Sequence, residues 1–133
     1  MSRQIKFRAW DNFYETMTDW FWVSSEGKAY EKPNIGYDTP HVEIEFNDDL
    51  IIMQYTGLKD INGTEVYEGD IIAEKVGPDE KDIIVEVVYL DGCFMGKEKE
   101  YEPEYPIKDF LDGEVIGNIY ENSELYKETG VKI

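Results

Sequence analysis

The sequence predicts a mainly β or α+β protein with few short helices, in which a small N-terminal sheet packs against a C-terminal barrel. Apolar and polar residues alternate over short runs, which is typical of half-buried strands. Residues that favour tight turns separate these runs. No segment keeps apolar residues at helical spacing over roughly ten positions, so a helical bundle is excluded.

The N-terminal lobe, residues 1–53, is expected to begin with a hairpin. Residues 5–10 alternate in polarity, and after a turn at Asp11-Asn12 the extended run at 20–23 is predicted to pair back on them. Residues 24–40 carry no sustained pattern and are interpreted as a long loop with room for one short element. The alternation at 41–46 predicts a half-buried strand.

An apolar strand at 50–55 is expected to lead into the segment 54–72. Gly57 and the Asn62-Gly63 pair tolerate positive φ, and Gly69-Asp70 turns the chain into an apolar pair. These features predict a hairpin that feeds a further strand. They therefore indicate turn chemistry rather than an active site.

Strands at 71–76 and 82–90 are expected to pair antiparallel across a turn at 77–79. Both faces of 82–90 are mostly apolar, so both are predicted to be covered. The tight turns between short strands suit a small SH3-like barrel over 54–122, followed by a tail at 123–133. The other expected elements are a turn at Asp91-Gly92, a strand at 93–95, a helical turn at 106–111, a strand at 114–120 and a short helix at 122–127.

The composition restricts the classes of partner. The 133 residues form one ordinary domain, and 30 acidic against 13 basic residues give a net charge of −17. Such a charge opposes direct binding to nucleic acids and to anionic membranes. The acids are interpreted as a solubility surface, and the alternative is a nucleic-acid mimic that blocks a host DNA-binding protein.

The chain is expected to be cytoplasmic. Its single cysteine, Cys93, excludes an internal disulfide and suits a reducing compartment. Neither a leader-like start nor an apolar run of about 20 residues occurs in the sequence. No membrane association is therefore predicted.

Signatures of catalysis and of metal binding are weak. His41 is the only histidine, so a zinc site of Cys and His ligands within one chain is excluded, whereas a Cys93–His41 nucleophilic pair stays open. Residues 60–65 resemble the start of a calcium loop without its distal glutamate, and the acidic run 98–104 fits a solvated loop. GxSxG and the P-loop pattern are absent. The expectation is a non-enzyme without cofactor or metal, and a carboxylate-dependent enzyme is the remaining alternative.

Aromatic residues gather near the N-terminus. They form either a core seam or a surface for a partner, and alternation across 20–22 sends some rings away from the buried face. The residues of the predicted partner-binding surface are Trp10, Phe13, Tyr14, Trp20 and Trp22.

Four separated motifs resemble the YopX family of phage and prophage proteins. They are IKFRAWD at 5–11, MQYTGLKD at 53–60, VYEGDII at 66–72 and EVIGNIYEN at 114–122, and they occur in the family's order. The resemblance implies a β-rich fold with an SH3-like barrel and an origin in a temperate phage or prophage, and it brings no catalytic residues. The leading hypothesis is an accessory protein that binds a host or phage protein in the bacterial cytoplasm, and a homo-oligomer through the same aromatic edge is an alternative.

Overall fold

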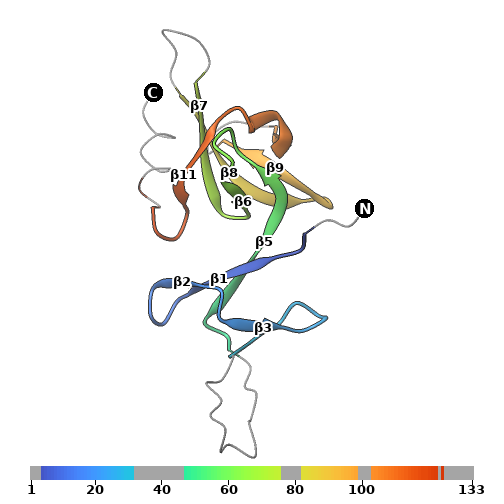
Figure 1. Ribbon diagram of the computed structural model, residues 1–133, viewed down its shortest axis with the longest axis vertical. Helices are drawn as coiled ribbons and strands as arrows, with labels where there is room; N and C mark the ends of the chain where they lie inside the picture. Colours follow the sequence, from blue (N-terminus) through green and yellow to red (C-terminus); the bar gives the residue numbers. More distant parts are fainter. Residues whose placement is uncertain (1–3, 32–46, 76–81, 99–102, 123, 125–133) are drawn as a thin grey trace, which may run out of the picture. The chain divides into compact units, whose positions relative to one another are not determined.

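The computed structural model describes residues 4–31, 47–75, 82–98, 103–122 and 124 (Figure 1). Strands account for most of the regular structure in these residues, and a 3-10 turn covers Ile107–Phe110. The predicted mainly β class is confirmed. The predicted strand at 41–46, the turn at 77–79 and all but two residues, 122 and 124, of the helix at 122–127 lie outside the described residues.

The chain divides into two compact units. Residues Phe7–Met53 form one, called here the N-terminal unit. The other, called the C-terminal unit, combines Met1–Lys6 with Gln54–Ile133. The long strand β5 (Leu50–Lys59) contributes residues to each unit. Its sheet has the strand order β2 (Thr16–Thr18), β1 (Phe7–Asp11), β5 and β6 (Glu65–Tyr67).

The N-terminal unit contains two short antiparallel pairs. Strand β1 (Phe7–Asp11) pairs with β2 (Thr16–Thr18), and β3 (Phe21–Val23) pairs with β4 (Ala29–Glu31). The predicted pairing of 5–10 with 20–23 is therefore wrong. Strand β4 is a short element of the kind for which the predicted loop at 24–40 had room.

The reason lies in two local turns. Asp11 Oδ1 accepts the N–H groups of Phe13 and Tyr14, which reverses the chain at once and brings β2 against β1. Ser24 Oγ accepts the Lys28 N–H at 3.1 Å in the next turn, which brings β4 against β3. A small core of Ala9, Phe21 and Ala29 holds the two pairs together, with Leu50 packed against it.

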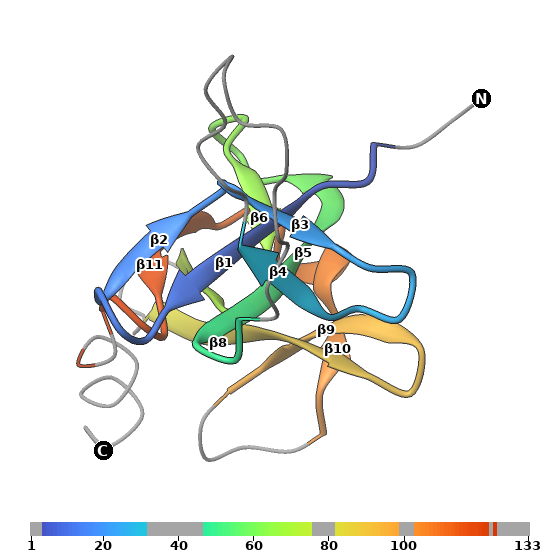
Figure 2. The same ribbon diagram turned by 90° about the horizontal axis from the view of Figure 1, so that it is seen from below.

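The C-terminal unit is built on an antiparallel sheet of order β10-β9-β8-β7-β11 that curls into a half-barrel (Figure 2). Pairing of Ile72 with Val85 sets the register between β7 and β8, so the predicted antiparallel pair is confirmed. The strands of this sheet are β7 (Asp70–Lys75), β8 (Asp82–Leu90), β9 (Cys93–Lys97), β10 (Tyr105–Pro106) and β11 (Glu114–Asn118).

The core of this unit lies on one face of β8. Val85 and Val87 are fully buried there, whereas Ile84 and Val88 on the other face are only partly buried and Leu90 is exposed. The prediction that both faces are covered therefore holds for the face of Val85 and Val87 and only in part for the other, because a half-barrel encloses one face of its strands. The buried cluster comprises Val66, Ile72, Val85, Val87, Ile107 and Phe110.

Glycine is required at two positions of the C-terminal unit, one in a turn and one in the core. Gly92 (φ +81°) follows Asp91 (φ 50°) in a two-residue turn between β8 and β9, and positive φ at both positions is the geometry of a type I′ hairpin. A Cβ on Gly96 would lie 2.5 Å from the Phe110 ring. Gly96 therefore allows Phe110 to pack against β9.

The predicted hairpin in the segment 54–72 is confirmed. β5 pairs with β6 (Glu65–Tyr67), and the carboxylate of Asp60 organises the turn between them. Asp60 Oδ1 accepts the N–H groups of Asn62 at 2.9 Å and Thr64 at 2.8 Å, and its Oδ2 accepts the Val115 N–H at 2.8 Å. One side chain therefore joins the β5–β6 turn to β11.

Two other turns depend on polar side chains in the same way. Asp70 Oδ2 accepts the Tyr67 N–H at 2.7 Å, and Asn118 Oδ1 accepts the N–H groups of Tyr120 at 3.0 Å and Glu121 at 2.8 Å. Asp60, Asp70 and Asn118 are the buried polar residues of the described chain. Each satisfies backbone donors that would otherwise be unpaired, which gives these residues a structural role.

Candidate functional site

Four large aromatic side chains are exposed in the N-terminal unit. The exposed fractions are 71% for Phe13, 72% for Tyr14, 53% for Trp20 and 37% for Trp22. Trp10, the fifth residue of the predicted surface, is partly buried on β1. The name aromatic surface is used below for Phe13, Tyr14, Trp20 and Trp22.

The turn between β1 and β2 positions the first two rings. Asp11 Oδ1 accepts the Phe13 N–H at 2.9 Å and the Tyr14 N–H at 3.1 Å. The two rings meet edge to face, with centroids 4.8 Å apart and planes at 82°. They therefore form one contiguous apolar knob at the end of a hairpin.

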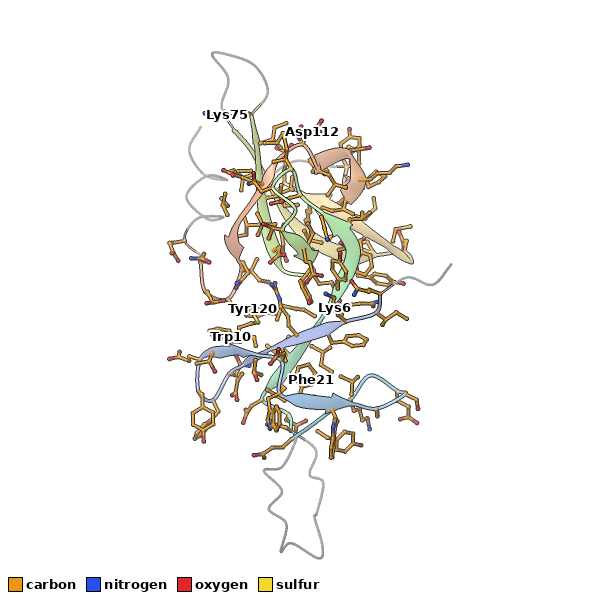
Figure 3. The ribbon with its side chains drawn as sticks, viewed as in Figure 1. Lys6, Trp10, Phe21, Lys75, Asp112 and Tyr120 are labelled. Carbon is orange, nitrogen blue, oxygen red and sulfur yellow. The ribbon has the colours of Figure 1, made fainter. Side chains whose placement is uncertain are left out.

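Strand alternation positions the tryptophan on β3. Phe21, labelled in Figure 3, is buried in the core of the N-terminal unit. Its neighbour Trp22 therefore faces outward, and it pairs with Tyr30 on β4. The Trp20 N–H donates to Thr18 Oγ1 at 3.0 Å, which fixes the backbone between β2 and β3. As predicted, some of the aromatic rings point away from the buried face. A role of these rings in binding stays a prediction.

The surroundings of the aromatic surface are acidic. Within 7–31 and 47–53 the N-terminal unit has seven acidic residues and two basic ones, Arg8 and Lys28. Glu15 lies between Tyr14 and β2, and Asp19 directly precedes Trp20. Apolar rings and carboxylates together suit a partner that offers cationic and apolar side chains.

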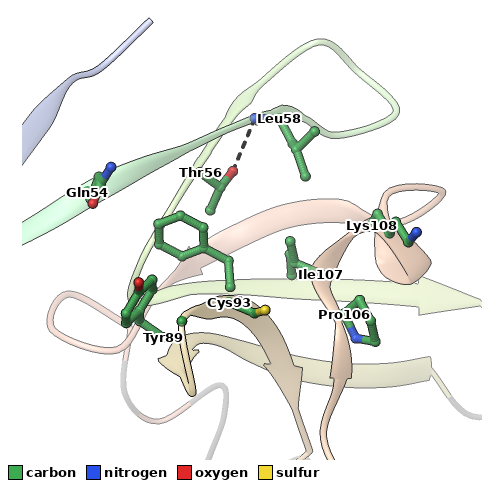
Figure 4. Close-up of a pocket in the computed structure, with 10 residues that line it drawn as sticks. Gln54, Thr56, Leu58, Tyr89, Cys93, Pro106, Ile107 and Lys108 are labelled. Carbon is green, nitrogen blue, oxygen red and sulfur yellow. Dashed lines mark hydrogen bonds between the residues drawn. The ribbon is translucent and has the colours of Figure 1, made fainter. Parts of the chain in front are cut away.

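A pocket of about 400 Å³ opens in the C-terminal unit (Figure 4). It lies between β5 on one side and the β8–β9 hairpin with β10 on the other. No sequence signal pointed to it, because its lining comes from separate segments whose exposed apolar residues are each unremarkable alone. The lining residues are Gln54, Thr56, Leu58, Tyr89, Gly92, Cys93, Phe94, Pro106, Ile107 and Lys108.

The described residues offer little for carboxylate or metal chemistry. They contain no group of three or more His, Cys, Asp or Glu side chains that could hold a metal ion. Burial raises the pKa of Glu86 on β8, and the Lys97 ammonium on the paired strand counteracts part of that increase. Cys93 is exposed, and its conceivable partner His41 lies outside the described residues.

Across the described part of the chain, no helix has the length and apolar character that a membrane crossing requires.

Comparison with known proteins identifies a family and several similar solved structures, two of which are described here. A family model described as YopX protein matches residues 6–127. Protein EF1440 from Enterococcus faecalis is 29% identical, with a TM-score of 0.62, and the match covers 94% of this chain and 99% of that one. Protein yopX from Bacillus subtilis is 21% identical, with a TM-score of 0.61, and the match covers 94% and 97% of the two chains. No curated protein matches the chain. Because the family model covers nearly the whole sequence, the chain belongs to the YopX family.

Proposed function

We propose that the chain is a non-enzymatic protein-binding module whose partner contacts the aromatic surface of the N-terminal unit. The observation that carries this proposal is the exposure of Phe13, Tyr14, Trp20 and Trp22 within ten consecutive positions. Large exposed rings are unfavourable in water, and aromatic residues are enriched in protein interfaces and in the positions that dominate binding energy.

The partner that fits this surface carries arginine or lysine beside apolar side chains. Cations bind to the faces of tryptophan and tyrosine rings, and the neighbouring Glu15 and Asp19 carboxylates add charge complementarity. The Asp11 hydrogen bonds hold the backbone of Phe13 and Tyr14 in a defined turn before binding. Less conformational entropy is then lost on association.

The setting we propose is the bacterial cytoplasm, with a phage or prophage gene as the source. Membership of the YopX family and the single cysteine support this setting. The partner is then a host or phage protein. A second copy of the chain is disfavoured as the partner because both surfaces would be acidic.

An acidic mimic of nucleic acid is the competing function, and the two make different predictions about salt. A contact dominated by mimicry weakens steeply as the salt concentration rises, because it depends on many charge pairs. A contact centred on buried rings weakens less.

The test is affinity capture from host cells at low and high salt, with nuclease present. The Phe13→Ser/Tyr14→Ser variant removes the knob, and the Ile61→Ser/Tyr105→Ser variant removes two exposed apolar side chains from the C-terminal unit as a matched control. We expect the knob variant to bind a stoichiometric basic partner at least about tenfold more weakly, as loss of central aromatic contacts implies, and the control to bind like the wild type. Equal binding by all three proteins, or loss of the partner at high salt alone, would contradict the proposal.

A further inference from the structure

The pocket of the C-terminal unit has an unusual charge for this protein. Lys108 is the only charged residue among the ten that line it, and no carboxylate is among them. Thirty of the 133 residues of the chain are acidic. The lining is therefore locally cationic in a strongly anionic protein.

The walls suit a flat apolar group. The rings of Tyr89 and Phe94 meet at 68° with centroids 5.1 Å apart on the β8–β9 side. Leu58, Pro106 and Ile107 add aliphatic surface from β5, β10 and the 3-10 turn. Aromatic rings prefer such edge and face contacts, and sites of this size commonly hold small molecules.

The polar groups of the pocket divide into two kinds. Thr56 Oγ1 donates to the Val66 carbonyl at 2.7 Å and accepts the Leu58 N–H at 3.2 Å, so this hydroxyl serves the strand (Figure 4). The Tyr89 hydroxyl, the Gln54 amide and the Lys108 ammonium are the remaining strong side-chain donors in the lining, beside the weakly donating Cys93 thiol. All three can donate to an oxygen anion.

From this chemistry we infer that the pocket binds a small aromatic anion, with its ring against Tyr89 and Phe94 and its carboxylate or similar group at Lys108. This site is separate from the proposed protein contact, which uses residues of the N-terminal unit. Either inference can fail without the other.

The sequence provides a reporter for each unit. Cys93 lines the pocket and is the only cysteine, so its alkylation rate reports occupancy of the pocket. The three tryptophans all lie in the N-terminal unit, so their fluorescence reports binding there instead. A ligand of the pocket should slow alkylation of Cys93.

The experiment follows alkylation of the full chain by the neutral reagent N-ethylmaleimide, with mass spectrometry as readout. Three probes share one ring system and differ in charge: 2-naphthoate, 2-naphthalenemethanol and 2-naphthylmethylamine. We expect 2-naphthoate to protect best, with a rate about tenfold lower at ten times its Kd. The amine should bind at least about threefold more weakly, although the net charge of the chain favours it.

Two substitutions separate the pocket from general effects. Lys108→Gln should abolish the preference for the anion, and Lys75→Gln, which removes an exposed lysine of the same unit outside the lining, should preserve it. Tyr89→Ala should weaken protection by 2-naphthoate without unfolding the protein, because Tyr89 is exposed. Absence of protection by all three probes, strongest protection by the amine, or an unchanged preference in Lys108→Gln would overturn the inference.

Discussion

Replacement of Asp60 by asparagine should destabilise the C-terminal unit, although the two side chains have nearly the same size. Asp60 is 7% exposed and accepts three backbone N–H groups, from Asn62, Thr64 and Val115. Asparagine can keep the two bonds to its remaining oxygen. Its NH₂ group would face the Val115 N–H, so one donor loses its acceptor and two donors oppose each other.

The magnitude follows from the bond that is lost. A hydrogen bond to a charged group contributes about 1.5–3 kcal/mol, and leaving a buried donor unpaired costs a similar amount. We expect Asp60→Asn to lower the free energy of unfolding of the C-terminal unit by about 2–3 kcal/mol at pH 7. Asp112→Asn removes the same charge from an exposed position of the unit and should change stability by less than about 0.5 kcal/mol.

The effect should depend on pH in a defined direction. Burial acts to raise the pKa of Asp60, but the backbone hydrogen bonds from Val115, Thr64 and Asn62 outweigh it and hold the pKa below its ordinary value of 3.8. A lowered folded-state pKa stabilises the fold above the unfolded-state pKa, and this stabilisation is lost as the pH falls through the folded-state value. The difference in free energy of unfolding between wild type and Asp60→Asn should therefore be constant from pH 5 to 7, where the pH is above 3.8. It should shrink as the pH falls below 3.8.

The stability of the C-terminal unit is measured by urea unfolding, with the NMR signals of Val85 and Val87 as the readout. This readout excludes the tryptophans, which all lie in the N-terminal unit. Equal stability of Asp60→Asn and Asp112→Asn at pH 7 would refute the structural role given to the Asp60 carboxylate. A difference that grows as the pH falls would refute the direction of the pKa shift.

Two further substitutions test local packing and the aromatic surface. Gly96→Ala places a methyl group 2.5 Å from the Phe110 ring and should cost about 1–3 kcal/mol in the same urea assay; wild-type stability would show that Phe110 is free to move. Asp11→Ala removes the acceptor for the N–H groups of Phe13 and Tyr14, so hydrogen exchange at these two amides should accelerate while exchange at Ala9 changes less. Equal acceleration at Ala9 would instead indicate loss of the whole β1–β2 pair.

The strands and turns of the C-terminal unit were largely predictable, because short stretches of sequence specify them. The Asp91-Gly92 turn, the apolar run of β8 and the glycines of the segment 54–72 each specify a backbone conformation within a few residues. The motifs shared with the family are explained by the same turns, since Asp60 and Asn118 bind backbone donors there.

The N-terminal unit was less predictable. Strand β2 is three residues long, TMT, and too short to show alternation, whereas the longer apolar run at 20–23 predicts a pairing with β1 that does not form. The decisive signal was the Asp11 side chain, which closes the turn two and three residues later. Exposure of Trp20 and Trp22 followed from alternation around the buried Phe21, whereas the pocket depends on long-range assembly of β5, β9 and the 3-10 turn.

The most direct test of the central claim, that function lies on the aromatic surface, is site-specific photo-crosslinking. The crosslinking amino acid p-benzoylphenylalanine would replace either Tyr14 of the knob or Tyr105 of the C-terminal unit, both exposed tyrosines. In host cells, we predict a discrete crosslinked partner from position 14 and none from position 105. The same product from both positions, or a product from position 105 alone, would contradict the account.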